Sequence, residues 1–262
     1  MAGLGGPGPG IAGILKTAGR FADSTNAATV GGRGQSGESA VDLHDSNGIG
    51  GAFPQYCPSI MELLLIRHGL PVTVDNRATG IEADPGLSEL GLRQAEALAD
   101  WLTNERIDAI YASPKSRARQ TVEPLASRLG VDVIVEPLVN EYDQGELEYI
   151  PIEHLKAAGD PRWEAMMNGD DLPNPEVFQA QVVKGIERII TANRGRTVVV
   201  GCHGGVVSAY LAHLLDIQRV MFYEAHYTSV ARVAASSAGH RSVRSMNELG
   251  HLKVAGISLS DL

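Results

Sequence analysis

The sequence predicts an α/β protein with three layers, in which a mostly parallel central sheet lies between helices on both faces. Short runs rich in Val, Ile and Leu alternate with longer segments of helical periodicity from residue 61 onward, an order typical of parallel sheets. The first run, MELLLI (61–66), is apolar almost throughout, as in a strand buried on both faces. Turns that contain glycine and histidine follow two of the runs, at RHG (67–69) and at CHGG (202–205).

Further helices and strands are expected after this first strand. The helices have apolar residues at helical spacing, and the strands are short runs rich in β-branched residues. In chain order the helices cover 87–105, 114–130, 174–195 and 206–215, and the strands cover 108–113, 131–136, 196–201, 227–235 and 241–247.

The first two of these helices have recognisable start and stop residues. Ser88 precedes the first helix, and its hydroxyl can accept a hydrogen bond from an amide of the first turn. Pro114 is expected in the first turn of the second helix, where its missing amide hydrogen is not needed. Gly130 closes that helix, since glycine adopts the left-handed conformation without steric cost.

Residues 142–175 interrupt the alternation and predict a small helical insertion over the site. Upstream, residues 1–60 are rich in Gly, Ser and Pro and offer little apolar burial to offset the entropy cost of ordering. They are expected to form a disordered extension, which is either natural or the result of a start assigned too early, with the natural start at Met61. A catalytic domain is then expected over 61–255 and a tail over 256–262.

Composition and charge disfavour several classes of protein. The formal net charge of −9 argues against a broad surface for nucleic acid or for an anionic membrane. Two cysteines, Cys57 and Cys202, form neither a disulfide framework nor a zinc motif, which suits a cytoplasmic protein. No apolar run reaches the roughly 20 residues of a membrane-spanning helix.

Four polar segments follow predicted strands. In open α/β sheets, ligands bind beyond the carboxyl ends of the strands, so these segments are expected to meet at one site. Together they supply two histidines, two arginines and a carboxylate. The segments are RHG (67–69), SPKSRARQT (113–121), NEYDQGELE (140–148) and GCHGG (201–205).

Five motifs, in this order, resemble those of the histidine phosphatase superfamily, the group that includes the cofactor-dependent phosphoglycerate mutases. They are LLIRHG, LSELGLRQA, YASPKSRARQT, NEYDQGELE and VVGCHGGVV, and RSVRSMNELGHL resembles the closing stretch of the family. The resemblance covers residues 61–252. It implies a phosphoglycerate mutase-like fold and catalysis through a phosphohistidine intermediate, with no metal or other cofactor.

The resemblance assigns roles to five residues. His68 matches the nucleophile that becomes phosphohistidine, so its attacking nitrogen must be unprotonated and its other nitrogen held by a hydrogen bond. Arg67 and Arg117 match phosphate-binding arginines, whose guanidinium groups offer paired donors to phosphate oxygens. His203 matches a second histidine that donates a hydrogen bond to the phosphoryl oxygens in the transition state, either as the neutral ring or as imidazolium. Glu141 matches the acid that protonates the departing oxygen and later takes a proton from water.

The surroundings of two of these side chains carry further expectations. Glu141 is chosen among several acids by the family pattern Glu-x-Asp-x-Gly (141–145). Its acidic neighbours Asp143, Glu146 and Glu148 are expected to raise its pKa by repulsion between like charges. Gly69 is expected to allow a tight turn that exposes the ring of the preceding histidine.

Substrate specificity is expected to come from the insertion. Large side chains there either line a pocket or pack against the domain: Tyr142, Tyr149, Trp163, Met166 and Met167. Cys202, in contrast, is expected to point into the core and to take no part in catalysis.

Three functions are compatible with these motifs. Glycolytic mutases carry a Ser or Thr and then an Asn after Arg-His-Gly, where this chain has Pro71 and Val74; Thr73 and Asn76 could replace them only in a longer loop. Residues 141–160 are also strongly acidic, whereas mutases have a basic stretch there. Hydrolysis of a small phosphorylated metabolite is therefore favoured over mutase activity and over non-catalytic binding of a phosphorylated ligand. The choice between monomer and homodimer stays open.

Overall fold

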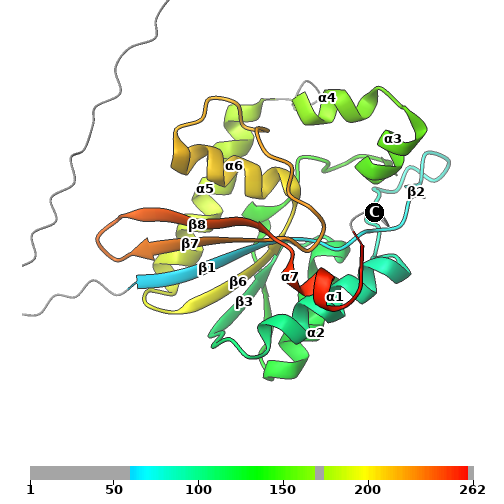
Figure 1. The fold of residues 1–262 in the computed structure, drawn as a ribbon. Coiled ribbons are helices and arrows are strands. Elements are labelled where there is room, and N and C mark those ends of the chain that lie inside the picture. The colour runs from blue at the N-terminus through cyan, green and yellow to red at the C-terminus, as the bar shows by residue number, and fades with distance from the viewer. Residues whose placement is uncertain (1–59, 169–173, 259–262) are drawn as a thin grey trace, which may run out of the picture. The chain divides into compact units, whose positions relative to one another are not determined.

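The computed structural model describes residues 60–168 and 174–258, drawn in colour in Figure 1. The predicted extension, apart from Ile60, and residues 259–262 of the predicted tail lie outside the described residues. The described chain from β1 onward forms a sheet between two layers of helices, which confirms the predicted α/β fold.

The central sheet contains a parallel part and an antiparallel edge. In spatial order its first four strands run parallel, whereas the fifth is antiparallel to the fourth and the sixth is antiparallel to the fifth. The sheet is therefore mostly parallel, as predicted, with the last two strands added as a hairpin. The strand order is β4 (Val133–Val135), β3 (Ala109–Ala112), β6 (Thr197–Cys202), β1 (Ile60–Arg67), β7 (Val230–Ser236) and β8 (Arg241–Glu248).

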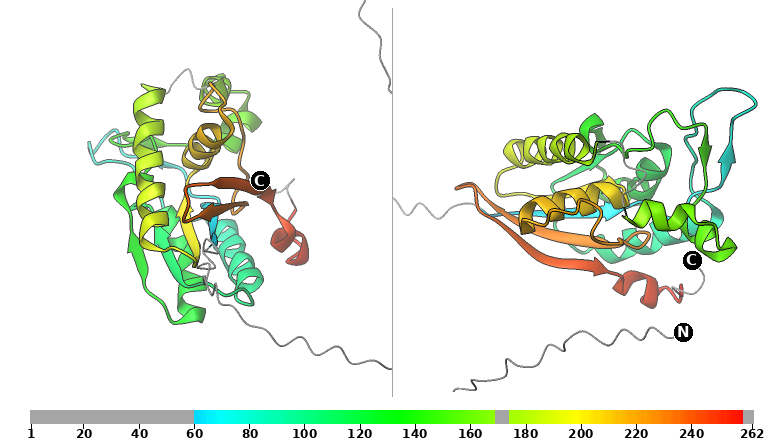
Figure 2. Two further views of the ribbon diagram at one scale, coloured as in Figure 1. Left: turned by 90° about the vertical axis from the view of Figure 1, so that its left-hand side faces the viewer. Right: turned by 90° about the horizontal axis from the view of Figure 1, so that it is seen from above.

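Helices cover both faces of the sheet, as the two views of Figure 2 show. The side chains of β1 alternate between these faces: Leu63 and Leu65 pack with α5 and α6, and Leu64 and Ile66 pack with α1 and α2. All four are fully buried, so the apolar run of β1 reflects its place between two helical layers. The helices are α5 (Pro175–Ala192) and α6 (Gly204–Leu215) on one face, and α1 (Glu89–Leu102) and α2 (Ser116–Leu129) on the other.

The predicted helix start and stop residues are confirmed in two of three cases. The Ser88 hydroxyl accepts a hydrogen bond from an amide of the first turn of α1 at 3.1 Å, and Gly130 ends α2 in the left-handed conformation, with φ of 66°. The prediction for Pro114 was wrong, because it precedes α2 instead of forming its first turn. Ser116 begins the helix instead, since the Asp84 carboxylate accepts bonds from its amide at 2.9 Å and from its hydroxyl at 2.7 Å.

The predicted insertion is helical in its described part. It contains α3 (Ile152–Ala158) and α4 (Arg162–Asn168). The sequence did not predict the strand before them: β5 (Glu148–Tyr149) pairs with β2 (Val74–Asp75) in a separate antiparallel sheet. Strands of two residues show no periodicity that a sequence pattern could reveal. Figures 1 and 2 place the insertion at the end of the sheet where β1 ends.

The last helix, α7 (Gly250–Val254), packs against α1. The packing continues past residue 255, where the predicted domain ends, because Ile257 is buried together with Ala97 and Leu252. None of the helices in the described ranges is long and apolar enough to cross a membrane.

Candidate active site

The carboxyl ends of the parallel strands lead into a pocket of about 330 Å³. Its base is formed by Arg67, His68, Arg117 and Glu141, four of the five site residues expected from the sequence. The fifth, His203, lies next to His68, with the two ring centres 5.2 Å apart. The structure thus brings all five side chains together from four separate segments of the chain.

His68 is held in one orientation and one tautomer. Its Nδ1 atom lies 2.8 Å from the carbonyl oxygen of Gly69, so Nδ1 carries the hydrogen and donates it. The Nε2 atom is then unprotonated, and the Nε–H of Arg117 donates to it at 3.3 Å. Burial and the charges of Arg117 and Arg67 hold the pKa of His68 well below its ordinary value. A neutral imidazole with an electron pair on Nε2 is the form that can attack phosphorus.

Gly69 has a different role from the predicted one. His68 is only 3% exposed, so the glycine after it does not open the ring to solvent. A Cβ atom at Gly69 would lie 2.8 Å from the carbonyl oxygen of Gly91 in α1, and one at Gly91 would lie 2.1 Å from the carbonyl oxygen of Leu70. The two glycines let the loop after β1 approach the first turn of α1, and this approach positions His68.

The two arginines of the pocket use only part of their hydrogen-bonding capacity. Arg117 Nη2 donates to the Asp143 carboxylate at 2.7 Å. Arg67 Nη1 donates to the carbonyl oxygen of Ala225 at 2.6 Å and lies 3.5 Å from the Glu153 carboxylate. The buried Nη1 of Arg117 and Nε of Arg67 have no hydrogen-bond partner within the described chain. Buried guanidinium N–H groups that lack an acceptor are suited to bind phosphate oxygens.

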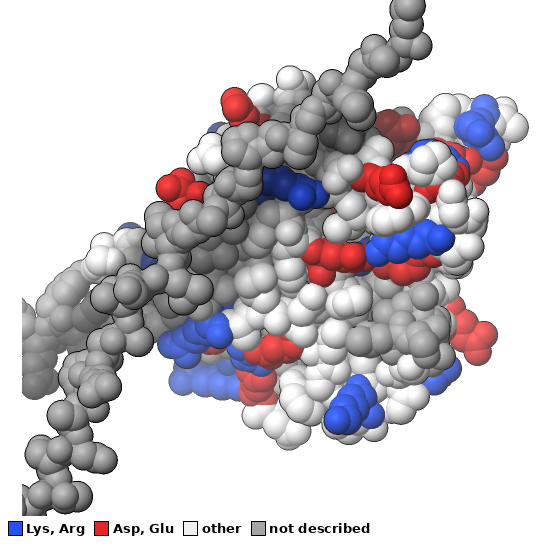
Figure 3. All heavy atoms as spheres, turned by 45° about the horizontal axis from the view of Figure 1, so that its top comes forward, with Lys and Arg blue, Asp and Glu red and all other residues white. Residues whose placement is uncertain are grey.

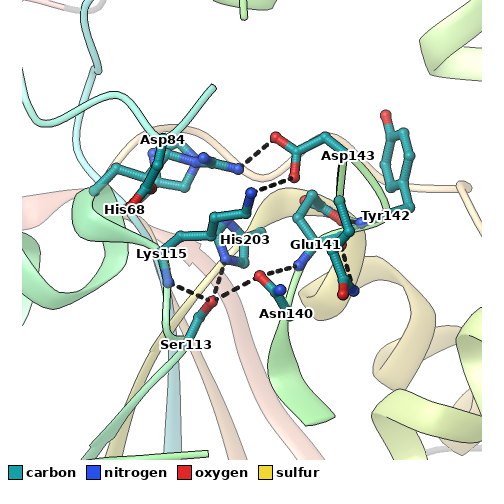
Figure 4. A network of polar contacts seen from close by, with 12 residues as sticks. His68, Asp84, Ser113, Lys115, Asn140, Glu141, Tyr142, Asp143 and His203 are labelled. Carbon is teal, nitrogen blue, oxygen red and sulfur yellow. Dashed lines mark hydrogen bonds and ion pairs between the residues drawn. The ribbon is translucent and has the colours of Figure 1, made fainter. Parts of the chain in front are cut away.

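His203 stands at the end of a chain of hydrogen bonds, shown in Figure 4. The Asn140 side-chain oxygen accepts bonds from the Glu141 amide at 3.0 Å and from the Ser113 hydroxyl at 3.2 Å. Because the hydroxyl hydrogen is used there, the Ser113 oxygen accepts from the Nε2–H of His203 at 2.8 Å. The Nδ1 atom of His203 is buried and has no hydrogen-bond partner among the residues that the structure describes.

The ring of His203 carries no charge in the free protein. Burial and the charge of Arg117 hold the pKa of His203 well below its ordinary value, so the ring is neutral in the free protein. A neutral ring with its hydrogen on Nε2 offers an acceptor at Nδ1 and no second donor. Donation from Nδ1 therefore requires that the ring take up a further proton. A phosphate dianion nearby would favour this uptake.

The Glu141 side chain is buried against the N-terminus of α6. Its Oε2 accepts from the Gly205 amide at 3.1 Å, and its Oε1 accepts from the Tyr142 amide at 3.2 Å. Burial is the first cause that raises the pKa of Glu141 to about 7, and the charge of Asp143 is the second. Repulsion from neighbouring acids, the predicted cause, is thus secondary to desolvation. At neutral pH a large fraction of Glu141 is protonated, as an acid catalyst must be.

Gly205 leaves room for this carboxylate. A Cβ atom at Gly205 would lie 2.3 Å from the Glu141 Oε1 atom. At Gly204 the nearest contact of a Cβ atom would be the Cδ atom of Arg67, at an ordinary 3.6 Å. The group that approaches Gly205 closely is therefore the side chain of Glu141.

Sequence reasoning missed several residues that hold the site in place. The Thr121 hydroxyl accepts from the amide of Gly69 at 2.9 Å and donates to the carbonyl oxygen of Arg117 at 2.7 Å, so it joins two catalytic segments. Ser113 and Asn140 orient His203, as described above. All three lie inside polar segments that follow strands, and this position was the one sequence signal that could have found them.

The insertion supplies much of the outer wall of the pocket. Trp163 does not line the pocket, and its ring centre lies 5.8 Å from the ammonium of Lys156. The other large side chains considered from the sequence do line the pocket: Tyr142, Tyr149, Met166 and Met167.

Cys202 precedes His203 and lies in the core, as expected from the sequence. Burial raises the pKa of its thiol to about 12, so it is protonated at neutral pH. The described residues contain no group of three or more His, Cys, Asp or Glu side chains placed to hold a metal ion.

Comparison with known proteins identifies a family. The sequence model of the histidine phosphatase superfamily (branch 1) matches residues 63–248. A bifunctional protein of Mycobacterium tuberculosis is 32% identical over 201 residues, which cover 72% of this chain and 54% of the relative. A Yersinia pestis protein named a probable phosphoglycerate mutase is 30% identical over 164 residues, covering 60% of this chain and 76% of the relative. The chain thus spans about half the length of the mycobacterial relative.

Solved structures share the fold. A mycobacterial glucosyl-3-phosphoglycerate phosphatase matches with a TM-score of 0.58 and 20% identity, covering 72% of this chain and 100% of that chain. A phosphoserine phosphatase from Entamoeba histolytica, solved with 3-phosphoglyceric acid, matches with a TM-score of 0.58 and 23% identity, covering 73% and 99%. At such identities the likeness concerns the fold, and it agrees with the predicted phosphoglycerate mutase-like architecture.

Proposed function

The chain belongs to the histidine phosphatase superfamily, and we propose that it hydrolyses phosphomonoesters through a phosphohistidine intermediate on His68, without a metal ion. The superfamily of phosphatases and mutases supports a phosphoryl-transferring enzyme. The observation that carries the proposal is the unprotonated Nε2 of His68, which lies in one pocket with two arginines and a Glu141 whose pKa is about 7.

In the first half-reaction, the electron pair of His68 Nε2 attacks phosphorus. The P–N bond forms while the bond between phosphorus and the ester oxygen breaks. The departing oxygen takes the proton of Glu141 and leaves as an alcohol. The enzyme then holds a phosphohistidine and a Glu141 carboxylate.

In the second half-reaction, Glu141 acts as a base. Its carboxylate takes a proton from water as the water oxygen attacks phosphorus, and the P–N bond breaks. Inorganic phosphate leaves, His68 regains its electron pair and Glu141 is again protonated. One carboxyl group thus serves both steps, which suits a pKa near the working pH.

Positive charge at the base balances the phosphoryl group. The unpartnered donors of Arg67 and Arg117 would bind its oxygens, and a proton taken up by His203 would add a third donor. Since these groups are already fixed by buried hydrogen bonds, little reorganisation is needed when charge develops in the transition state.

Hydrolysis is favoured over mutase activity by the loop after His68. The Thr73 hydroxyl lies 3.4 Å from a ring nitrogen of His154, and the Asn76 amide donates to the carbonyl oxygen of Glu82. Neither Thr73 nor Asn76 lines the pocket, so neither takes the place of the substrate-binding residues that mutases carry after their histidine.

A trapping experiment tests the proposal. We expect turnover of para-nitrophenyl phosphate to persist in excess EDTA, and rapid denaturation during turnover to leave a phosphoryl label on His68 that is labile in acid and stable in alkali. A hydroxyl-linked label, or activity that EDTA abolishes, would contradict it. Exchange between 2- and 3-phosphoglycerate without release of phosphate would assign a mutase instead.

A further inference from the structure

The outer wall of the pocket is largely apolar. Ile150 and Ile152 precede and begin α3, Met166 and Met167 belong to α4, and Met221 follows α6. All five side chains are half-buried and line the pocket above its catalytic base. An alkyl or aromatic group beside them would leave water on binding, which favours an apolar alcohol portion in the substrate.

Positive charge in the pocket is confined to its base. Among the described lining residues only Arg67 and Arg117 are permanent cations, and both are needed for the phosphoryl group of the substrate. A second anionic group on the alcohol portion, such as a carboxylate, would meet no further permanent cation among the described lining residues. A desolvated anion without a cation or a full set of donors is costly.

Several cations beside the pocket are already paired with its acidic residues. Lys156 forms an ion pair with Glu224, and Arg162 and Arg77 lie 3.0 and 3.2 Å from oxygens of Glu148. On the face shown in Figure 3, basic and acidic side chains lie next to one another in the same way. A substrate carboxylate would therefore have to displace one of these acids to gain a cation.

Acidic side chains also line the rim of the pocket itself. Glu146 and Glu148 come from the segment before the insertion helices, and Glu224 follows α6. Glu146 is exposed and makes no ion pair with a described residue. Repulsion from these carboxylates acts against a second anion and has no effect on an uncharged alcohol portion.

Arg219 is a further basic side chain that contacts the wall. Its guanidinium donates to the carbonyl oxygen of Met167 at 2.5 Å and to the Asn168 side chain at 3.3 Å. It lines a different hollow, formed with the end of α6 and the start of α5, and not the catalytic pocket. Its contribution can be tested directly.

From this distribution we infer that the preferred substrate is a phosphomonoester of an uncharged, apolar alcohol, and that the wall discriminates against a second anionic group. The inference rests on the proposed hydrolytic function and adds the substrate class. It assigns specificity to the wall formed by Ile150, Ile152, Met166, Met167 and Met221, and it distinguishes this site from one that binds phosphorylated hydroxy acids.

A matched pair of substrates tests the inference on the unaltered protein. The pair is n-hexyl phosphate and its analogue that ends in a carboxylate instead of a methyl group, whose ester oxygens have nearly the same basicity. We expect kcat/KM to be at least about tenfold higher for n-hexyl phosphate, because the rim carboxylates repel a second anion. Equal or faster hydrolysis of the carboxylate analogue would overturn the inference while leaving the hydrolytic function intact. Failure to hydrolyse the pair and para-nitrophenyl phosphate would refute the hydrolytic function itself.

Three variants locate the discrimination. Met166→Lys adds a cation to the wall, and we expect it to reduce the ratio between the two substrates to about threefold or less. Val177→Lys adds the same charge at a position that is 68% exposed on α5, and the ratio should not change. Arg219→Ala should also leave the ratio unchanged, and a selective loss of activity on the carboxylate analogue would show that Arg219 binds it. If Met166→Lys lowers the folded fraction measured by circular dichroism, Ile150→Lys provides the same test.

Discussion

The base and the outer wall of the pocket differ in how they are held. The base side chains are at most 9% exposed, and hydrogen bonds to backbone atoms and to neighbouring side chains fix them. The wall side chains come largely from the insertion and are half-buried, beside rim acids of which Glu148 and Glu224 are ion-paired. A fixed base suits a reaction that is the same for every phosphomonoester, whereas a looser wall suits selection among alcohol portions. Changes at the base should therefore reduce all turnover, and changes at the wall should shift preference.

The largest effect is expected at the nucleophile. His68→Ala removes the atom that attacks phosphorus, so we expect kcat for para-nitrophenyl phosphate to fall by at least about 10⁴-fold. The matched control is His240→Ala, at an exposed histidine between β7 and β8. Comparable losses in the two variants, each with an unchanged circular dichroism spectrum, would place the chemistry elsewhere.

The next effect separates the two roles of Glu141. Glu141→Gln cannot supply or accept the proton, so we expect kcat/KM for n-hexyl phosphate to fall by about 10³-fold. The loss should be smaller for para-nitrophenyl phosphate, whose leaving oxygen needs little protonation.

The pH dependence of the unaltered enzyme checks the same assignment. Since the pKa of Glu141 is about 7, kcat/KM for the alkyl ester should decline as the pH rises above this value. Burst kinetics with the aryl ester should separate the two half-reactions. The first forms the phosphohistidine and needs little acid for this ester, and the second hydrolyses that intermediate. An alkyl-ester profile that stays flat to pH 9 would remove Glu141 from the acid role.

Stability provides a measurement independent of activity. Ionisation of buried Glu141 is unfavourable in the folded state, so its pKa is raised from 4.5 to about 7. The stability that the protonated Glu141 side chain contributes is fully present below pH 4.5 and is lost as the pH rises through 7. Relative to Glu141→Gln, the wild type should lose on the order of 3 kcal/mol of unfolding free energy between pH 4.5 and 8. Urea melts at several pH values would measure this, and a pH-independent difference would show an ordinary pKa.

A smaller effect is expected at Ser113, which holds the base residue His203 in place. Ser113→Ala removes the oxygen that accepts from His203 Nε2–H, so the ring loses its fixed tautomer. We expect kcat to fall by about tenfold with KM nearly constant, and the Nε2 resonance of His203 to shift in nitrogen NMR spectra. Ser113→Thr, which keeps the hydroxyl, should restore part of kcat, whereas no recovery would point to a packing defect.

The smallest effect is expected at the wall. Met167→Ala removes apolar surface and no reacting group, so KM for n-hexyl phosphate should rise about threefold to tenfold while kcat stays within about twofold. For methyl phosphate, which does not reach the wall, neither constant should change. A large fall in kcat for both esters would contradict the division between base and wall.

The sequence by itself determined the α/β class, the strand that is buried on both faces and the polar segments that meet at the pocket. These are local properties, because apolar periodicity reports burial and the polar residues directly follow strand ends. The resemblance to histidine phosphatases singled out five side chains within these segments and assigned their expected roles.

Only the tertiary structure decided what surrounds those five side chains. The contact of Gly69 with Gly91, the bonds from Ser113 to His203 and Asn140, and the pairing of β2 with β5 all join segments far apart in the chain. The same is true of the pKa of Glu141, which depends first on burial and only then on its acidic neighbours. Desolvation, steric fit and hydrogen-bond geometry are set by which distant groups come into contact, and a linear pattern of residues does not contain that information.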